Sequence, residues 1–305
     1  MGPQLFGPGV ISTEDDESGG VLSPDGNEFY FVRNAPYTTS PALSVICVSH
    51  RRGLQWSEPQ ALPFSGQFWN RPPRLSPDGN TMLFGSSRPM PVPDGGGMHL
   101  WRSRRTASGW SVPEPMPAPI NGPGGSTFDA SMAADGTLYM TRASSEGYHI
   151  AASRLVNGQY TTPELMPPPV RSPKQNVDVE PFIAPDQSYL VFVSQWIGPD
   201  PHTRRPEELI AGGSPYPRGD LYITYRRHNG WTQPRHLANG VNSFAEESFP
   251  SVSPDGRWLF FSSERSMFEV PVPRLTWARL EREWPGIFNG RGNIYRIDMA
   301  QVKGE

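Results

Sequence analysis

Ser23-Pro24-Asp25-Gly26, Ser76-Pro77-Asp78-Gly79 and Ser253-Pro254-Asp255-Gly256 are three copies of one tetrapeptide in a chain of 305 residues. Degraded copies stand at Ala133-Ala134-Asp135-Gly136 and Ala184-Pro185-Asp186-Gln187. Each copy predicts a tight turn, because proline presets φ and glycine accepts a positive φ. A short run of alternating apolar residues follows every copy. The motif therefore predicts five β-hairpins.

The copies begin 53, 57, 51 and 69 residues apart. A repeat of this length with several short strands per unit is typical of a β-propeller, in which each blade buries its faces against its neighbours. Four strand-like pieces recur: one before the turn, one after it, a third that is rich in aromatic residues, and a fourth that opens with an aromatic residue and a proline. We therefore predict an all-β fold, a five-bladed propeller of four-stranded antiparallel blades.

The fourth piece occurs in only four of the five copies. It begins at Trp56, Trp110, Tyr160 and Trp231, and the last copy has none. The N-terminal Pro3-Gln4-Leu5-Phe6 resembles Pro234-Arg235-His236-Leu237, which predicts that Leu5 to Ser12 form the outer strand of the fifth blade and close the ring. A repeat that runs from end to end predicts a single domain over 1–305, with blades at about 13–66, 67–123, 124–173, 174–243, and 244–305 plus 3–12.

Composition excludes several classes of protein. The net charge is −3 and the arginines are scattered among acidic residues, so nucleic acid is not an expected partner. The 36 prolines and 31 glycines accompany 15 Phe, 10 Tyr and 9 Trp, a mixture typical of turn-rich globular structure and not of disorder. The single cysteine, Cys47, excludes an internal disulfide and is expected to be buried. No apolar run is long enough to span a membrane.

The repeat carries a family resemblance. Ser253-Pro254-Asp255-Gly256, then Leu259 to Arg265, then Asn293 to Asp298 resembles the repeat of TolB-like, WD-repeat-like propellers, over nearly the whole chain. The resemblance implies the propeller fold. For function it implies a protein-binding module, a gating domain of a peptidase or an uncharacterised secreted protein. The chain contains no Gly-x-Ser-x-Gly motif of a hydrolase domain.

Loop lengths predict which face of the propeller carries the site. The loops between the second and third strands are long at Pro89 to Met98, Gln195 to Gly219 and Ser266 to Gly292. Binding sites usually lie on long loops over a rigid scaffold, so we assign the site to this face, opposite the Ser-Pro-Asp-Gly turns. Within the last loop, Arg274 to Arg282 has helical spacing and predicts a short helix that either covers the site as a lid or packs on a blade edge.

Acidic residues precede most of the turns, six and four positions before the first residue of the motif. Positions two apart on a strand share a side, so we expect these acids to ring the mouth of the central channel, with Asn70 and Arg71 interrupting the ring. They would form a cation site for Ca²⁺ or another divalent ion, hold a protonated general acid, or merely cap loop amides. The acids are Glu17, Asp129, Asp178, Glu180 and Glu247.

Departures from the repeat supply the other candidates. His99 and His149 begin the third strands of adjacent blades, and either ligate, shuttle protons or bind an anion, or are half-buried structural imidazoles. Arg33 and Arg142 replace a serine at the end of the second strand, and either clamp an anion or neutralise the acids. Arg88 and Arg265 follow the motif and are expected to be structural. Trp69 and Trp196 are aromatic residues beside acids, as in sugar-binding subsites, although a core role fits them equally.

Two classes of function fit these residues. The first is a module, expected to be monomeric, that binds a polar small molecule, a glycan or a protein on the long-loop face. The second is an enzyme, either similar to glycoside hydrolases or a lyase or cyclase, in which Glu180, Asp178, Asp129 and His149 act as catalytic groups. The sequence opens without a signal peptide, which predicts a cytoplasmic protein, or a periplasmic or secreted one if a signal has been removed.

Overall fold

The structure of the protein is a computed structural model that carries side chains. It describes residues 2–35, 43–91, 97–122, 126–145, 147–172, 177–195, 219–243, 245–266, 276–283 and 285–303. Trp196 and most of the two longest loops, 196–218 and 267–275, lie outside the described residues.

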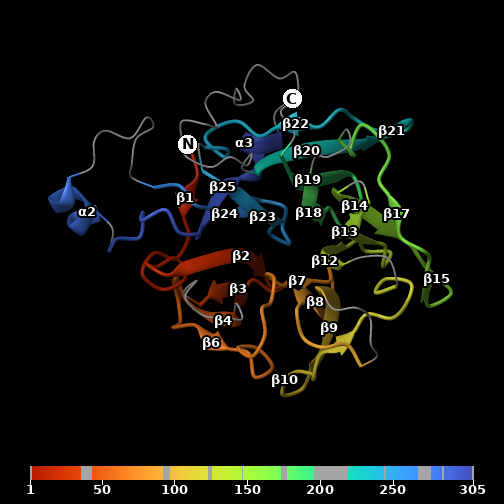
Figure 1. Cartoon of the computed structure of the whole chain (residues 1–305), viewed down its shortest axis with the longest axis horizontal. Helices are drawn as coiled ribbons and strands as arrows, with labels where there is room; N and C mark the ends of the chain where they lie inside the picture. The colour runs from red at the N-terminus through yellow and green to blue at the C-terminus, as the bar shows by residue number, and fades with distance from the viewer. Residues whose placement is uncertain are drawn as a thin grey trace.

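Five antiparallel sheets are arranged in a ring, which confirms the predicted five-bladed propeller (Figure 1). The innermost strand of each blade precedes the Ser-Pro-Asp-Gly turn, and the next two strands follow outward in chain order. The three inner strands are β2 (Asp16–Leu22), β3 (Glu28–Asn34) and β4 (Ser44–Arg52); β7 (Arg74–Leu75), β8 (Thr81–Ser86) and β9 (His99–Thr106); β12 (Thr127–Met132), β13 (Leu138–Ser144) and β14 (Gly147–Ser153); β18 (Asp178–Ile183), β19 (Tyr189–Ser194) and β20 (Asp220–Arg227); and β23 (Glu247–Val252), β24 (Trp258–Ser263) and β25 (Asn293–Asp298).

The fourth strand of a blade is broken into short pieces. In the first, second and fourth blades two separate segments pair with the same third strand. The break coincides with the proline of the fourth-strand motif, because proline has no N–H to donate to the ladder. The pieces are β5 (Gln55–Trp56) and β6 (Gln60–Ala61); β10 (Gly109–Trp110) and β11 (Glu114–Pro115); β17 (Glu164–Leu165), preceded by the hairpin of β15 (Leu155–Val156) and β16 (Gln159–Tyr160); and β21 (Gly230–Trp231) and β22 (Arg235–His236).

The N-terminal segment closes the ring, as predicted, but with a shorter strand. β1 (Gln4–Leu5) pairs with β25, and the Phe6 N–H donates to the Ile294 carbonyl at 2.8 Å. The equivalent bond in the fourth blade runs from Leu237 N to Leu221 O at 3.0 Å. The expected strand from Leu5 to Ser12 ends early because the chain turns at Gly7, whose φ is +57°. Ile11 is nevertheless fully buried beyond the turn.

The Ser-Pro-Asp-Gly motif forms the expected turn. In the first copy the Asp25 carboxylate accepts the Ser23 hydroxyl and the Asn27 N–H, and the Ser23 hydroxyl oxygen accepts the Glu28 N–H at 2.9 Å. Gly26 has a φ of +72°. Each of the three complete copies therefore satisfies its own polar groups within the turn.

Buried apolar residues fill the spaces between neighbouring blades, where for example Phe6 packs against Phe29 and Phe260. Cys47 is buried as expected, and burial raises the pKa of its thiol to about 11. Two short helices are described. α2 (Trp277–Glu283) confirms the helix predicted in the last loop and lies at the edge of the ring in Figure 1, and α3 (Met299–Lys303) follows β25. No helix of the described residues is long and apolar enough to cross a membrane.

Candidate functional site

A bulge in the innermost strand decides which acids reach the central channel. Gly19, Asp129, Glu180 and Phe249 stand four positions before the turn motif, and all have a positive φ, between +50° and +61°. The ladder between the first and second strands shifts register at each of these points. A β-bulge reorients the side chains around it, so positions six and four before the turn no longer share a side. The expected single ring of acids therefore separates into two sets.

The outer set, six positions before the turn, caps loops inside the blades and does not ring the mouth. The Glu17 carboxylate accepts the N–H and the hydroxyl of Thr13, at 2.9 and 2.6 Å, and Glu247 binds Ser243 in the same way at the same distances. Asp178 accepts both groups of Ser172, at 2.8 and 2.7 Å. All three acids are almost completely buried. Their repeated geometry is that of structural caps.

Asn70 and Thr127 occupy the same position in the other two blades. The Asn70 side chain donates to the Ser44 carbonyl and accepts the Ser86 hydroxyl, while Thr127 donates to the Ile120 carbonyl. Both are buried. They are caps as well, without charge.

The candidate arginines Arg33 and Arg142 lie with this outer set. Arg33 Nε is 3.1 Å from Glu17 Oε1, and Arg142 donates to the Ile120 carbonyl and to the Thr127 hydroxyl, both at 3.2 Å. Of the two predicted roles, neutralising an acid fits Arg33 better than clamping an anion. Arg142 forms part of the cap in its own blade.

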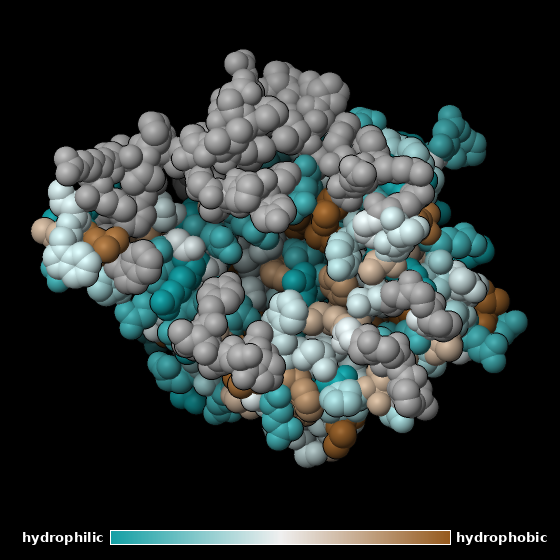
Figure 2. Space-filling view, viewed as in Figure 1, coloured by the Kyte–Doolittle hydropathy of each residue, from teal (hydrophilic) through white to brown (hydrophobic). Residues whose placement is uncertain are grey.

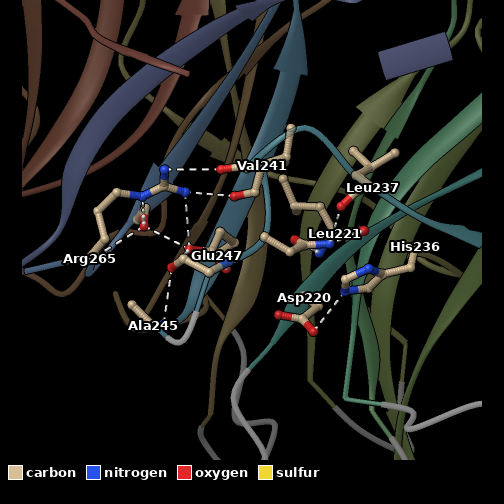
Figure 3. A network of polar contacts seen from close by, with 12 residues as sticks. Asp220, Leu221, His236, Leu237, Val241, Ala245, Glu247 and Arg265 are labelled. Carbon is tan, nitrogen blue, oxygen red and sulfur yellow. Dashed lines mark hydrogen bonds and ion pairs between the residues drawn. The ribbon is translucent and has the colours of Figure 1, made fainter. Parts of the chain in front are cut away.

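Arg88 and Arg265 are structural, as expected from the motif. Arg265 donates to the Val241 carbonyl at 2.6 Å and to the Gly240 carbonyl at 3.1 Å, and lies 3.3 Å from Glu247 (Figure 3). Arg88 donates to the Phe64 carbonyl at 2.9 Å. Each guanidinium satisfies loop carbonyls between blades.

The two candidate histidines are both buried. His149 Nδ1 is 3.1 Å from Asp178 Oδ2, within the cap of its blade. His99 is 7% exposed at the start of β9. In the next blade the pattern is inverted, because Asp220 begins the third strand and pairs with His236 at 3.0 Å (Figure 3). The acid–histidine pairs are therefore also part of the structure of the blades.

The inner set meets in the central channel. Arg71 Nε and Nη2 hold the two oxygens of Asp129 at 2.9 and 2.6 Å, and Nη2 also donates to Glu180 Oε1 at 2.6 Å. The guanidinium lies over the rings of Phe249 and Phe128, 4.6 and 5.4 Å from their centroids. Residues of the second, third, fourth and fifth blades are thus joined across the channel.

All four oxygens of these two carboxylates accept hydrogen bonds, because Glu180 Oε2 accepts the Phe249 N–H at 2.6 Å. Burial, followed by the nearby charge of Asp129, raises the pKa of Glu180 to about 7 against the opposing effect of Arg71. The Glu180 carboxyl is thereby balanced between its two protonation states near neutral pH.

A second buried arginine lies close to the same cluster. Arg74 is 5% exposed, and the charges of Asp129 and Glu180 act on it while burial lowers its pKa to about 10. Two arginines and two carboxylates therefore form a channel cluster that has no net charge when all four are ionised. Arg74 is not among the residues predicted from the sequence. Its signal there is the Pro72-Pro73 interruption, which shortens β7 to two residues.

Above the cluster lies the long-loop hollow, a cavity of about 360 Å³ where the first strands begin and the second strands end. Figure 2 shows hydrophilic residues gathered around a hollow near the middle of the ring. Arg71 forms part of its floor, and Trp69, 41% exposed, forms part of its wall. The polar and acidic lining residues are Asp16, Ser18, Asn34, Asn70, Glu246, Ser248, Ser262 and Glu264.

The described residues contain no group of three or more His, Cys, Asp or Glu side chains placed to hold a metal ion. Asp129 and Glu180 are bound to Arg71, which occupies the position that a divalent cation would take between them. The cation at the channel mouth stays a prediction.

No family model matches the chain, and no curated protein matches it. Among solved structures, TolB from Acinetobacter baumannii is similar at 15% identity and a TM-score of 0.47, with 92% of this chain and 54% of TolB covered. The α-L-arabinofuranosidase PaAbf62A from Podospora anserina is similar at 12% identity and a TM-score of 0.49, with 98% and 93% covered, and a puromycin hydrolase at 15% and 0.43, with 81% and 34% covered. The chain thus spans about half of TolB and a third of the hydrolase. These neighbours are distant, and the fold assignment rests on the five sheets of the chain itself.

Proposed function

We propose that the protein binds a small polar molecule carrying a positive charge, such as an amino sugar, in the long-loop hollow. The observation that carries the proposal is the charge of the lining. Among the described residues of the lining there are three acids, Asp16, Glu246 and Glu264, and one arginine, which is already paired with two carboxylates. An ammonium group would complement this excess of negative charge.

The other lining groups suit a hydroxylated ligand. Hydroxyls and amides of Ser18, Asn34, Ser248 and Ser262 can donate and accept hydrogen bonds. Trp69 offers an exposed aromatic face on which a sugar ring or an ammonium group packs favourably. A cavity of about 360 Å³ is in the size range of small-molecule sites.

The contacts of the channel cluster favour ligand binding over catalysis. Each oxygen of Asp129 and Glu180 already accepts a strong hydrogen bond, mostly from a permanent cation. A general acid or base needs an oxygen that reaches the reacting group. The carboxylates instead fix Arg71, which makes the floor of the hollow rigid.

The test compares three ligands of one size that differ in charge: glucosamine, glucose and glucuronate. Calorimetry and thermal shift should rank them in that order, because a ligand that binds only the native state stabilises it by an amount set by concentration over affinity. Trp69→Ala should weaken glucosamine binding about tenfold, since an aromatic–cation contact contributes about 1 to 2 kcal/mol. Trp277→Ala on α2, a more exposed tryptophan outside the hollow, is the matched control. Preference for glucuronate, or equal losses in the two variants, would contradict the proposal.

The alternative function is catalysis with Glu180 as general acid, and its raised pKa is the observation in favour. Glu180→Gln separates the two functions on a panel of nitrophenyl glycosides. Catalysis requires turnover by the wild type that the variant loses while it still binds glucosamine. A binding protein shows no turnover in either form.

A further inference from the structure

A second hollow, of about 140 Å³, opens on the opposite face, where the Ser-Pro-Asp-Gly turns meet around the channel. We call it the turn-face hollow. Four of the five turns contribute their proline to its lining, and side chains such as Met132 and Phe182 add further apolar surface. The proline that sets the turn thus also builds an apolar collar. Its lining prolines are Pro24, Pro77, Pro185 and Pro254.

Arg74 is the one charged residue among the described residues that line the turn-face hollow. Its two hydrogen bonds are donated to backbone carbonyls, by Nη1 to Pro73 at 3.3 Å and by Nη2 to Pro250 at 3.0 Å. A guanidinium has five N–H donors, so two bonds leave donor capacity unused. Burial lowers the pKa of Arg74, but the charges of Asp129 and Glu180 oppose this effect. Arg74 therefore keeps its positive charge at neutral pH. No described carboxylate forms an ion pair with it.

We propose that the turn-face hollow binds a small monocarboxylate with an apolar body, and that Arg74 receives the carboxylate. A buried guanidinium favours a carboxylate because two parallel N–H···O bonds match its geometry. The apolar collar then selects for the rest of the ligand. A cavity of about 150 Å³ is known to accept benzene, so a ligand of the size of benzoate suits this one.

The aspartates of the turns do not prevent entry of an anion. They stand on the same face, but none belongs to the lining, and each is held by neighbouring groups of its own turn, as Asp25 is by Ser23 and Asn27. Exposed charges of this kind are screened over a distance of about 10 Å at 0.1 M salt. Their repulsion acts on the rate of entry more than on the bound carboxylate.

The probe pair is benzoate and its neutral analogue benzamide, titrated into the full chain with ¹³C-methyl-labelled methionine. Met132 lines the hollow and reports occupancy, while Met166, which is buried between the third and fourth blades and does not line the hollow, is the internal control. We expect the Met132 signal to shift with benzoate, and benzamide to bind at least about tenfold more weakly because hydrogen bonds to a charged acceptor are lost. Arg74→Met should abolish this preference for benzoate over benzamide.

Equal binding of the two probes, shifts of Met166 instead of Met132, or a preference for benzoate that survives Arg74→Met would each overturn the proposal. Arg74→Met removes a buried charge, so Met132→Trp serves as a second variant that keeps the proposal testable if Arg74→Met does not fold. It fills the hollow with a larger side chain and leaves Arg74 in place. Because this variant lacks the reporter methyl, benzoate binding is measured by calorimetry, and binding at wild-type strength in Met132→Trp would place the anion elsewhere and so reject the site.

Discussion

Two sets of acidic residues stand two positions apart on the innermost strands, and they are held in different ways. The outer acids Glu17, Asp178 and Glu247 take hydrogen bonds from their own loops, within four to six residues along the chain. The inner acids Asp129 and Glu180 depend on Arg71, which is 58 and 109 residues away. The outer arrangement repeats from blade to blade and serves the scaffold, whereas the inner one occurs once and joins several blades.

The largest effect is expected from removal of the shared cation. Arg71→Met leaves two buried carboxylates without their partner, which should lower the free energy of unfolding by about 4 kcal/mol. Denaturant titration measures this value. Arg102→Met is the control, because Arg102 pairs with the half-exposed Glu114 and should cost less than about 1 kcal/mol. Adding Asp129→Asn and Glu180→Gln to Arg71→Met should restore part of the lost free energy of unfolding. If stability does not recover, the unpaired carboxylates are not the origin of the loss.

The second largest effect is expected in the pH dependence of stability, through the inner acid Glu180. Its pKa is raised in the folded protein to about 7 from 4.5, so the folded state binds more protons than the unfolded state in this window. The free energy of unfolding should therefore fall between pH 4.5 and 7, by on the order of 3 kcal/mol from this group, and then level off.

Glu180→Gln isolates that contribution from those of other acids. The difference in unfolding free energy between wild type and variant should change steadily from pH 4.5 to 7 and stay flat above pH 7. A difference that is constant over the whole range would mean that Glu180 is ionised throughout, and that the Arg71 pair outweighs burial.

The fold was predictable from the turns, but the separation of the two sets was not. Because side chains alternate along a regular strand, positions six and four before the turn were expected on one side of the sheet. The positive φ at Asp129, Glu180 and Phe249 breaks this alternation. Residues other than glycine seldom adopt this conformation, so the sequence carried one visible signal, Gly19 in the first copy. The sequence marks Arg71 only as an interruption of the ring of acids. Its role depends on a guanidinium that spans the channel, which no local pattern encodes.

A smaller effect is expected from an outer cap. Asp178→Ala removes the acceptor of the Ser172 N–H and of the hydroxyls of Ser172 and Ser194, which should cost about 2 kcal/mol because these buried donors lose their partner. The affinity for glucosamine, measured by calorimetry, should be unchanged. A marked loss of affinity in a variant that remains folded would move Asp178 from the scaffold to the site.

A still smaller effect is expected where an outer acid has an arginine of its own. Arg33 lies 3.1 Å from Glu17, but its side chain is 31% exposed, and Glu17 keeps both hydrogen bonds from Thr13 when the arginine is removed. Arg33→Met should therefore cost about 1 kcal/mol, as for a partly screened ion pair. The contrast with Arg71→Met under identical denaturant conditions tests the comparison directly. If both variants lose the same stability, local hydrogen bonds do not substitute for the cation, and the outer acids depend on their arginines as strongly as the channel cluster does.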